Sequence, residues 1–109
     1  MKLIVAIVQG EDAPGTVQAL SRQGVSVTRV SSSGGFLQQG NSTLMVGIAD
    51  DRVQQVIDII RENCRERSRF LTPMPPMVEP GEFFMPHPVE VQVGGATIFV
   101  LPVDQFEKL

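Results

Sequence analysis

The sequence predicts an α+β fold, and the order of the secondary-structure patterns leads to this prediction. Two stretches carry apolar residues at the spacing of one helix face, and five have the apolar runs or alternation of strands. Their order is β-α-β-β-α-β plus a C-terminal hairpin strand. With right-handed crossovers, this order places four antiparallel strands in one sheet with both helices on one face, which is the ferredoxin-like arrangement. A chain of 109 residues suits one such domain, so residues 1–109 are expected to form a single domain.

The first strand and the first helix have clear sequence signals. Residues 2–9, KLIVAIVQ, form a continuous apolar run rich in β-branched side chains, which is typical of a strand covered on both faces. The helix after it is expected to have Asp12 as its N-cap, to carry Pro14 in its first turn and to end at Gly24. One apolar stripe is expected along this helix, formed by Ala13, Val17 and Leu20.

The second and third strands are expected at residues 25–31 and 42–49. In the earlier stretch, valines alternate with polar residues until Val30 breaks the alternation, which predicts a bulge or a twist near Arg29. The later stretch has Gly47 in its interior. A glycine there weakens a sheet unless something approaches the backbone closely.

The second helix has the most regular pattern in the sequence. Either Asp50 or Asp51 is its expected N-cap. Its apolar stripe is formed by Val53, Val56, Ile57, Ile60 and Cys64. Two further strands, 89–93 and 96–103, flank Gly94–Gly95, and this glycine pair predicts a two-residue hairpin between them.

Residues 67–88 are expected to form one long loop. The segment holds six of the eight prolines and three of the five methionines, and proline at this density precludes a regular strand or helix. A loop of this length in a compact domain is uncommon unless it serves as a lid or a binding loop. The basic run before and within it is expected to be a solvated helix end, or to turn one arginine toward a neighbouring loop or an anionic ligand. This run comprises Arg61, Arg65, Arg67 and Arg69.

The first and last strands of the predicted sheet are apolar on both faces. Two helices cover only one face, so the other face needs a cover from outside the chain. Copies of the same chain supply such a cover, and we therefore expect a homo-oligomer.

The sequence has no pattern of residues typical of an active site. His87 is the only histidine and lies between two prolines, with no hydroxyl or thiol beside it, while Cys64 falls on an apolar helix stripe. Asp50 and Asp51 are adjacent carboxylates, but they begin a helix, and no metal-ligand spacing occurs. We therefore expect no catalytic residue, no metal and no cofactor, so that the protein is not an enzyme.

Composition and charge exclude several classes of partner. A net charge of −3 and the absence of Trp and Tyr do not suit a surface that binds nucleic acid. The apolar run from Leu3 to Val8 is shorter than the apolar region of a signal peptide, and no stretch approaches the ~20 apolar residues of a membrane span. Because Cys64 is the only cysteine, no internal disulfide can form, and a cytoplasmic location is expected.

Residues 31–43, SSSGGFLQQGNST, are the best candidate for a binding loop. A turn does not require the apolar pair Phe36 and Leu37, so something is expected to cover them. The glycine pair Gly34–Gly35 can direct backbone N–H groups toward a phosphate, Phe36 offers a flat face to a base, and Asn41 can pair with an adenine edge. Packing of Phe36 and Leu37 in an oligomer interface, with Asn41 as a turn residue, is the alternative.

Three blocks of the sequence resemble one known family. GGFLQQGNST, VGIADDRV and PHPVEVQVGGATIFVLPV are similar to blocks of the cyclic-di-AMP receptors, PII-like signal transduction proteins of bacteria, and the resemblance covers essentially the whole chain. It implies a homotrimer of ferredoxin-like subunits that binds cyclic-di-AMP at each subunit interface and changes loop conformation on binding. It implies no catalysis and leaves the protein target unknown.

The resemblance also implies which residues contact the ligand. The matched positions are Thr28, Gly35, Phe36, Leu37, Asn41, Gly47 and Phe99. Gly34, which precedes Gly35, is also expected to contact the ligand. Gly35 and Phe36 are expected to offer backbone donors and a stacking face. Asn41 is expected to contact adenine, and Gly47 to let the ligand approach the strand closely. Phe99 is expected to come from the facing subunit.

The chain departs from the family pattern just before Thr28. Family members with established ligand binding resemble N-F-R-A-T-K there, whereas this chain has GVSVTR, so Gly24 and Ser26 replace an asparagine and an arginine. Near the end, Lys108 stands where the family often has a glutamine. Loss of the arginine predicts weaker binding of the dinucleotide.

Two other functions stay open from the sequence. One is a PII-like interaction module that binds a different adenine nucleotide or no small ligand. The other is a small ferredoxin-like hydrolase of phosphate esters or acylphosphates. Such an enzyme needs an arginine and an asparagine on a phosphate-binding loop, and only the loop is present.

Overall fold

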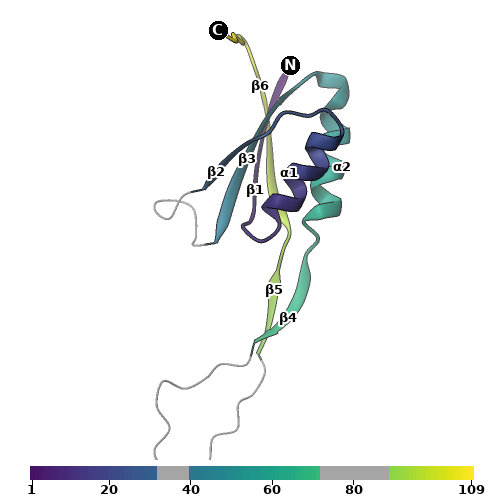
Figure 1. The fold of residues 1–109 in the computed structure, drawn as a ribbon, viewed down its shortest axis with the longest axis vertical. Helices are drawn as coiled ribbons and strands as arrows, with labels where there is room; N and C mark the ends of the chain where they lie inside the picture. The colour runs from purple at the N-terminus through teal and green to yellow at the C-terminus, as the bar shows by residue number, and fades with distance from the viewer. Residues whose placement is uncertain (32–39, 72–88) are drawn as a thin grey trace, which may run out of the picture.

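The computed structural model of the chain describes residues 1–31, 40–71 and 89–109 (Figure 1). Most of the predicted binding loop, 32–39, and most of the proline-rich segment, 72–88, lie outside the described residues. The elements in chain order are β1 (Lys2–Gln9), α1 (Ala13–Arg22), β2 (Thr28–Ser31), β3 (Asn41–Ile48), the short 3₁₀ helix η1 (Asp50–Arg52), α2 (Val53–Asn63), β4 (Arg67–Leu71), β5 (Val89–Val93) and β6 (Ala96–Pro102).

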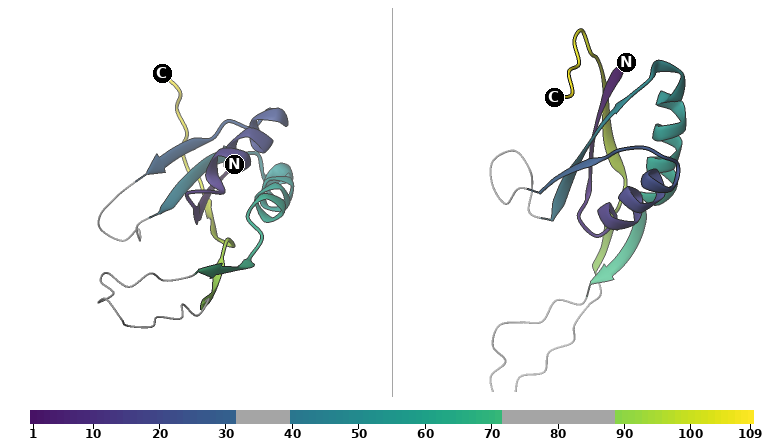
Figure 2. Two further views of the ribbon diagram at one scale, coloured as in Figure 1. Left: turned by 60° about the horizontal axis from the view of Figure 1, so that its bottom comes forward. Right: turned by 45° about the horizontal axis from the view of Figure 1, so that its top comes forward.

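Four of the strands form an antiparallel sheet in the order β2-β3-β1-β6. Both helices lie on one side of this sheet, as two further views also show (Figure 2). The arrangement is that of a small α+β domain compatible with the ferredoxin-like fold, and the predicted placement of both helices on one face is confirmed. None of the described helices is long and apolar enough to cross a membrane.

The core lies between the sheet and the helices. In β1, every second side chain is buried, namely Ile4, Ala6 and Val8, because alternate residues of a strand point to opposite faces. The sheet and helix residues that share this core are Leu44, Val46, Ile48, Ala13, Leu20, Val56, Ile60 and Cys64. The apolar stripes predicted for the two helices supply the helix side of the core, except that Ile59 and not the predicted Ile57 packs against it.

The two ends of α1 differ from each other. Asp12 stands at the predicted N-cap position, but its side chain makes no capping bond. At the other end, Gly24 has a φ of +74°, its N–H donates to the Ser21 carbonyl, and the N–H of Val25 donates to the Leu20 carbonyl. These two bonds are a Schellman motif, which requires a residue in the left-handed region. The predicted stop at Gly24 is confirmed.

The predicted aspartate cap of the second helix is wrong. Asp50 and Asp51 lie in η1, and the residue that precedes α2 is Arg52, which makes no side-chain capping bond. Instead, the Asp50 carboxylate forms an ion pair with the Met1 amine, with 2.8 Å between Asp50 Oδ1 and the amine nitrogen. The hydrogen bond from this amine lowers the pKa of Asp50.

The strand predicted over 25–31 is shorter in the structure. Pairing with β3 begins at Thr28 and runs without interruption to Ser31, so the predicted bulge near Arg29 is wrong. Val30 faces the side of the sheet without helices, opposite Thr43, and is 42% exposed. Val25 and Val27, which belong to the core side, lie before this strand, whereas Val30 lies within it on the opposite face, so the alternation in the sequence breaks at Val30.

The glycine pair Gly94–Gly95 does not form the predicted hairpin. β5 pairs with β4 in a separate two-stranded sheet, whereas β6 pairs with β1. The predicted loop over 67–88 therefore begins with a strand, β4, and not with irregular structure. Figure 1 shows β4 and β5 extending away from the main sheet, at the end opposite the two termini.

The glycine pair is instead where two connections pass each other closely. The N–H of Gly95 donates to the Cys64 carbonyl, and a Cβ added at Gly94 would overlap the Arg65 carbonyl oxygen. Both glycines have positive φ, +87° and +79°. Steric contact with the α2–β4 connection, and not a tight turn between paired strands, explains why glycine is needed here.

Arg67 ties the base of β4 to the turn between β1 and α1. Its Nη2 lies 3.0 Å from Asp12 Oδ1 and 3.2 Å from Glu11 Oε1, and its Nη1 donates to the Arg65 carbonyl at 3.0 Å. The hydrogen bond with Asp12 raises the pKa of Arg67. Arg67 therefore faces a neighbouring loop, as one of the two interpretations of the basic run predicted, and is not part of a solvated helix end.

Gly94→Ala is expected to destabilise the fold by more than about 1 kcal/mol, because alanine is strained at positive φ and its methyl group would overlap the Arg65 carbonyl oxygen. Gly15→Ala is the matched control. Gly15 lies inside α1 with nothing within 4 Å of an added Cβ, so the change is expected to stabilise by up to about 1 kcal/mol. Urea unfolding followed by circular dichroism measures both, and a Gly94→Ala variant as stable as the unmodified protein would contradict the close crossing.

Candidate functional site

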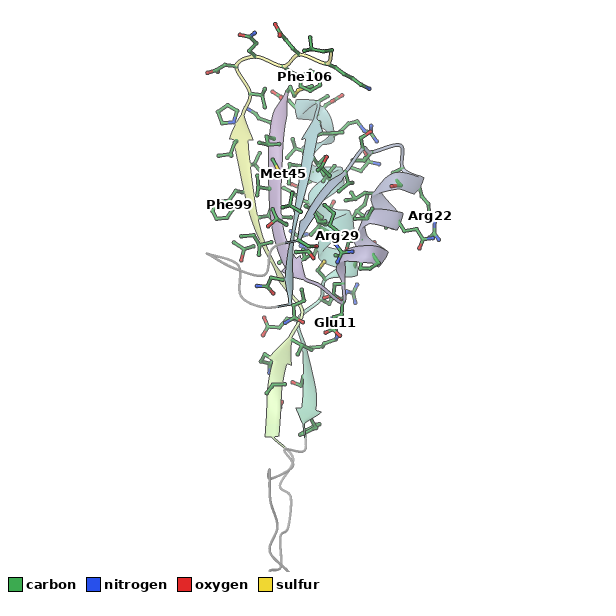
Figure 3. The ribbon with its side chains drawn as sticks, turned by 60° about the vertical axis from the view of Figure 1, so that its left-hand side comes forward. Glu11, Arg22, Arg29, Met45, Phe99 and Phe106 are labelled. Atoms are coloured by element: carbon green, nitrogen blue, oxygen red, sulfur yellow. The ribbon has the colours of Figure 1, made fainter. Side chains whose placement is uncertain are left out.

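The face of the sheet without helices is largely apolar. The strand registers place Thr28, Met45, Val5 and Phe99 side by side in one row across all four strands. The next row contains Gly47, Leu3 and Leu101. Phe99 is 50% exposed and Leu101 45%. Figure 3 shows Phe99 directed away from the helix layer. An open apolar face of this kind marks a surface for a partner or a ligand.

A pocket of about 330 Å³ lies on this face, at the end of the sheet that carries the two termini. Two of the predicted ligand residues, Thr28 and Gly47, line it. Its other lining residues are Met1, Leu3, Met45, Val103 and Phe106. The structure therefore brings two predicted residues together and adds five that the sequence did not single out.

Strand pairing positions both predicted residues. Thr28 is the first residue of β2 and pairs with Met45, two positions before Gly47 on β3, so the threonine and the glycine occupy neighbouring rows of the same face. Nothing lies within 4 Å of a Cβ added at Gly47, so no other part of the described chain uses the space that the missing side chain leaves. The strand backbone at Gly47 is thus open to a flat group from outside.

Asn41 lies at the opposite end of β3, away from this pocket. It is the first residue of the strand, directly opposite Gln9, and it lines a second pocket of about 360 Å³ together with Gly94, Gly95 and other residues. Asn41 and Gly47 are six positions apart along the strand, which corresponds to roughly 20 Å. A single base cannot contact both, so the structure does not bring these two predicted residues together within one chain.

The other predicted residues also stand apart from the pocket. Phe99 lies on the edge strand β6, two strands away from β3, and is not part of the pocket lining. Gly34, Gly35, Phe36 and Leu37 lie outside the described residues.

The end of the predicted binding loop is attached to the β1–α1 turn. Gly40 has a φ of +93°, and its carbonyl accepts a hydrogen bond from the N–H of Gly10. A Cβ at Gly10 would also contact this carbonyl, so glycine is required for the close approach. Glu11 and Asp12 of this turn bind Arg67, and Gly10 of the same turn binds Gly40, the residue directly before β3.

The pocket residues that were not predicted from the sequence lie at two kinds of position. Met45 and Leu3 face the same side of the sheet as Gly47, and their strand parity alone would have identified them. Phe106 lies in a polar tail without periodicity, where an isolated phenylalanine is the only signal. Its place in the pocket depends on how the tail folds back.

The two departures from the family pattern have different structural settings. Gly24 occupies the left-handed position of the Schellman motif, which asparagine also tolerates, so the backbone here suits either residue. Ser26 is exposed and precedes the pocket residue Thr28 by two positions. An arginine in place of Ser26 would bring a cation close to the start of β2.

Cys64 is a buried thiol and not a reactive one. It is 2% exposed, its Sγ lies 3.2 Å from Thr16 Oγ1, and burial raises its pKa. A raised pKa keeps the thiol protonated, and the thiol is a poor nucleophile compared with the thiolate. In the described parts of the chain, no three His, Cys, Asp or Glu side chains gather as a metal site.

The fold is that of a small α+β domain, compatible with the ferredoxin-like fold, and the open face of its sheet presents an apolar pocket with one hydroxyl among its described lining residues. Comparison with known families agrees and is more specific. Residues 1–109 match the cyclic-di-AMP receptor family, and the chain belongs to this family. Membership supports a role in cyclic-di-AMP binding and signalling, as the motifs had indicated.

A solved structure shares the fold over nearly the whole chain. It is the crystal structure of a functionally unknown protein from Pediococcus pentosaceus ATCC 25745, with 44% sequence identity and a TM-score of 0.75. The match covers 99% of this chain and 96% of that one. The similarity supports the fold, while the role of that protein is itself unknown.

Cys64 is expected to resist iodoacetamide at pH 8 in the folded protein and to react at the rate of a free thiol in 8 M urea, because burial both blocks access and raises the thiol pKa. Mass spectrometry of samples taken over time measures the rate. Equal rates in the two states would contradict the buried position.

Proposed function

We propose that the protein is a PII-like signalling protein that binds cyclic-di-AMP between the subunits of a homotrimer and changes loop conformation on binding. One observation carries this proposal. In a chain that belongs to the cyclic-di-AMP receptor family over its full length, the matched residues Thr28 and Gly47 meet at an apolar pocket on the open face of the sheet. We further propose that the chain forms a single domain, acts in the cytoplasm and does not catalyse a reaction.

The chemistry of the pocket suits an adenine base. Its volume of about 330 Å³ falls within the range of small-molecule sites. Leucine, valine and methionine side chains match the faces of a purine, and the hydroxyl of Thr28 can exchange a hydrogen bond with a polar edge. The open backbone at Gly47 leaves room for the ring to lie against the strand.

The trimer would complete the site and cover the open face. Phe99 and Leu101 are exposed on the edge strand, and Val30 is exposed on the opposite edge. A second copy placed on this face removes these side chains from water, which is favourable by roughly 25 cal/mol per Å² of apolar surface. In this arrangement Phe99 contacts the ligand of the neighbouring copy, and the loop residues Gly34, Gly35, Phe36 and Leu37 supply backbone donors and a stacking face.

Two described contacts support a link between the ligand loop and the β4–β5 ribbon. Gly10 binds the carbonyl of Gly40, at the end of the ligand loop, and Glu11 and Asp12 of the same turn bind Arg67, at the base of β4. A change in the ligand loop can therefore act on the ribbon through this one turn. We propose that a protein target, whose identity is unknown, recognises the resulting conformation.

Ser26→Arg is expected to tighten cyclic-di-AMP binding by about ten- to a hundredfold, because a hydrogen bond from a guanidinium to a charged phosphate contributes roughly 1.5–3 kcal/mol. Titration calorimetry measures the affinity. Ser21→Arg, which adds the same charge at an exposed position of α1, is the control and is expected to leave the affinity within twofold.

Cyclic-di-GMP is expected to bind more weakly than cyclic-di-AMP to the unmodified protein and to both variants, because guanine presents an acceptor where adenine presents a donor. No heat from the unmodified protein and none from Ser26→Arg would contradict dinucleotide binding and favour an interaction module.

The protein is expected to elute from size exclusion with a light-scattering mass of three times the 11.9 kDa chain at micromolar concentration. Phe99→Glu is expected to lower this mass, because the charge would be buried in the covered face. The same change at exposed Phe70 on β4 serves as the control. A mass of one chain for the unmodified protein would exclude the trimer.

A further inference from the structure

We infer that Phe106 is a base-stacking residue of the ligand site, with its ring on one face of an adenine whose other face lies over the Gly47 backbone. This inference rests on the proposed function and assigns a role to a residue outside the matched family positions. Among the described residues that line the pocket of about 330 Å³, Phe106 is the only aromatic one.

The tail that carries Phe106 is attached to the sheet directly beside the pocket. β6 pairs with β1 up to Pro102, opposite Lys2, and the next residue, Val103, donates its N–H to the Met1 carbonyl at 3.3 Å. Val103 and Phe106 both line the pocket, so the tail turns back toward the sheet after β6. Figure 3 shows Phe106 at this end of the sheet, beyond Met45.

The residues that line the pocket suit a flat ring. On the sheet side, Gly47 leaves the backbone bare, with nothing within 4 Å of the position of a Cβ. Met45 and Leu3 stand on either side of this bare stretch, on β3 and on the neighbouring strand β1. Thr28 carries the only hydroxyl among the described lining residues. A planar group with apolar faces and a hydrogen-bonding edge, such as a nucleobase, fits this combination.

The exposure of Phe106 indicates that its ring lacks a cover in the single chain. It is 62% exposed although it lines the pocket, and its neighbours in the tail, Gln105 and Glu107, are polar and hydrogen-bond to each other. Leaving an aromatic face in water forgoes its hydrophobic stabilisation. A base in the pocket would cover the ring and gain the stacking that aromatic side chains provide to nucleobases.

The test exploits the absence of tryptophan and tyrosine from the chain. Phe106→Leu keeps an apolar side chain but removes the π face, and Phe106→Trp keeps the face and adds a fluorophore. Phe70→Leu and Phe70→Trp are the matched controls, since Phe70 is 68% exposed on β4 and lies outside the pocket lining. Cyclic-di-AMP is titrated into each variant by calorimetry and, for the tryptophan variants, by fluorescence. Light scattering follows the assembly of each.

Phe106→Leu is expected to weaken cyclic-di-AMP binding at least fivefold, and Phe70→Leu to leave it within twofold. The emission of Phe106→Trp is expected to fall as the ligand saturates, with the dissociation constant that calorimetry gives, whereas Phe70→Trp reports movement of the β4–β5 ribbon and is expected to show no quenching by a stacked base. If the unmodified protein binds and Phe106→Leu binds equally well, the inference is overturned while the proposed function stands. If Phe106→Leu loses affinity only because the assembly dissociates, the ring packs on a neighbouring copy and the inference is also overturned. Absence of binding by the unmodified protein overturns both.

Discussion

Coverage of the sheet on only one face is the constraint on which the rest of this structure depends. β1 is the second strand from one edge and is apolar from Leu3 to Val8, but the helices bury only its alternate residues Ile4, Ala6 and Val8. The other face keeps its apolar residues in a row from Met45 to Phe99 without a cover in the single chain. Because burial of apolar surface stabilises folding and association alike, this face is where a ligand and further copies gain the most.

A second constraint is the crossing of two chain connections at the base of the β4–β5 ribbon. Gly94 and Gly95 pass so close to the α2–β4 connection that a side chain at Gly94 would overlap the backbone. Arg67 leaves the same connection and binds the turn between β1 and α1, which also holds Gly40. The ribbon, the helix layer and the end of the ligand loop therefore meet at one turn. A displacement of any one of them changes the packing of the others, which gives the proposed signalling a physical route.

The candidate site is spread along the open face and is not gathered in one pocket. Thr28 and Gly47 lie at one end of β3, Asn41 lies roughly 20 Å away at the other, and Phe99 lies on the far edge strand. Such a distribution suits a ligand with two bases bound between copies better than a mononucleotide bound to one chain. It also explains how Phe106, outside the family motifs, enters the site, since the tail crosses the sheet end where Thr28 and Gly47 meet.

The sequence by itself determined the features that depend on neighbouring residues. Periodicities of two and 3.6 predicted the core, Gly24 ended α1 because only its backbone conformation matters there, and the motifs identified the family. Tertiary structure decided the rest. Gly94–Gly95 resembled a hairpin because glycine meets a steric need in both a tight turn and a close crossing, and local sequence does not distinguish the two. The Asp12 carboxylate binds Arg67, 55 residues away, and makes no capping bond. Phe106 lines the pocket although it lies in a tail without any periodic pattern. Contacts between distant segments compete with local preferences, and only the folded chain shows which of them prevails.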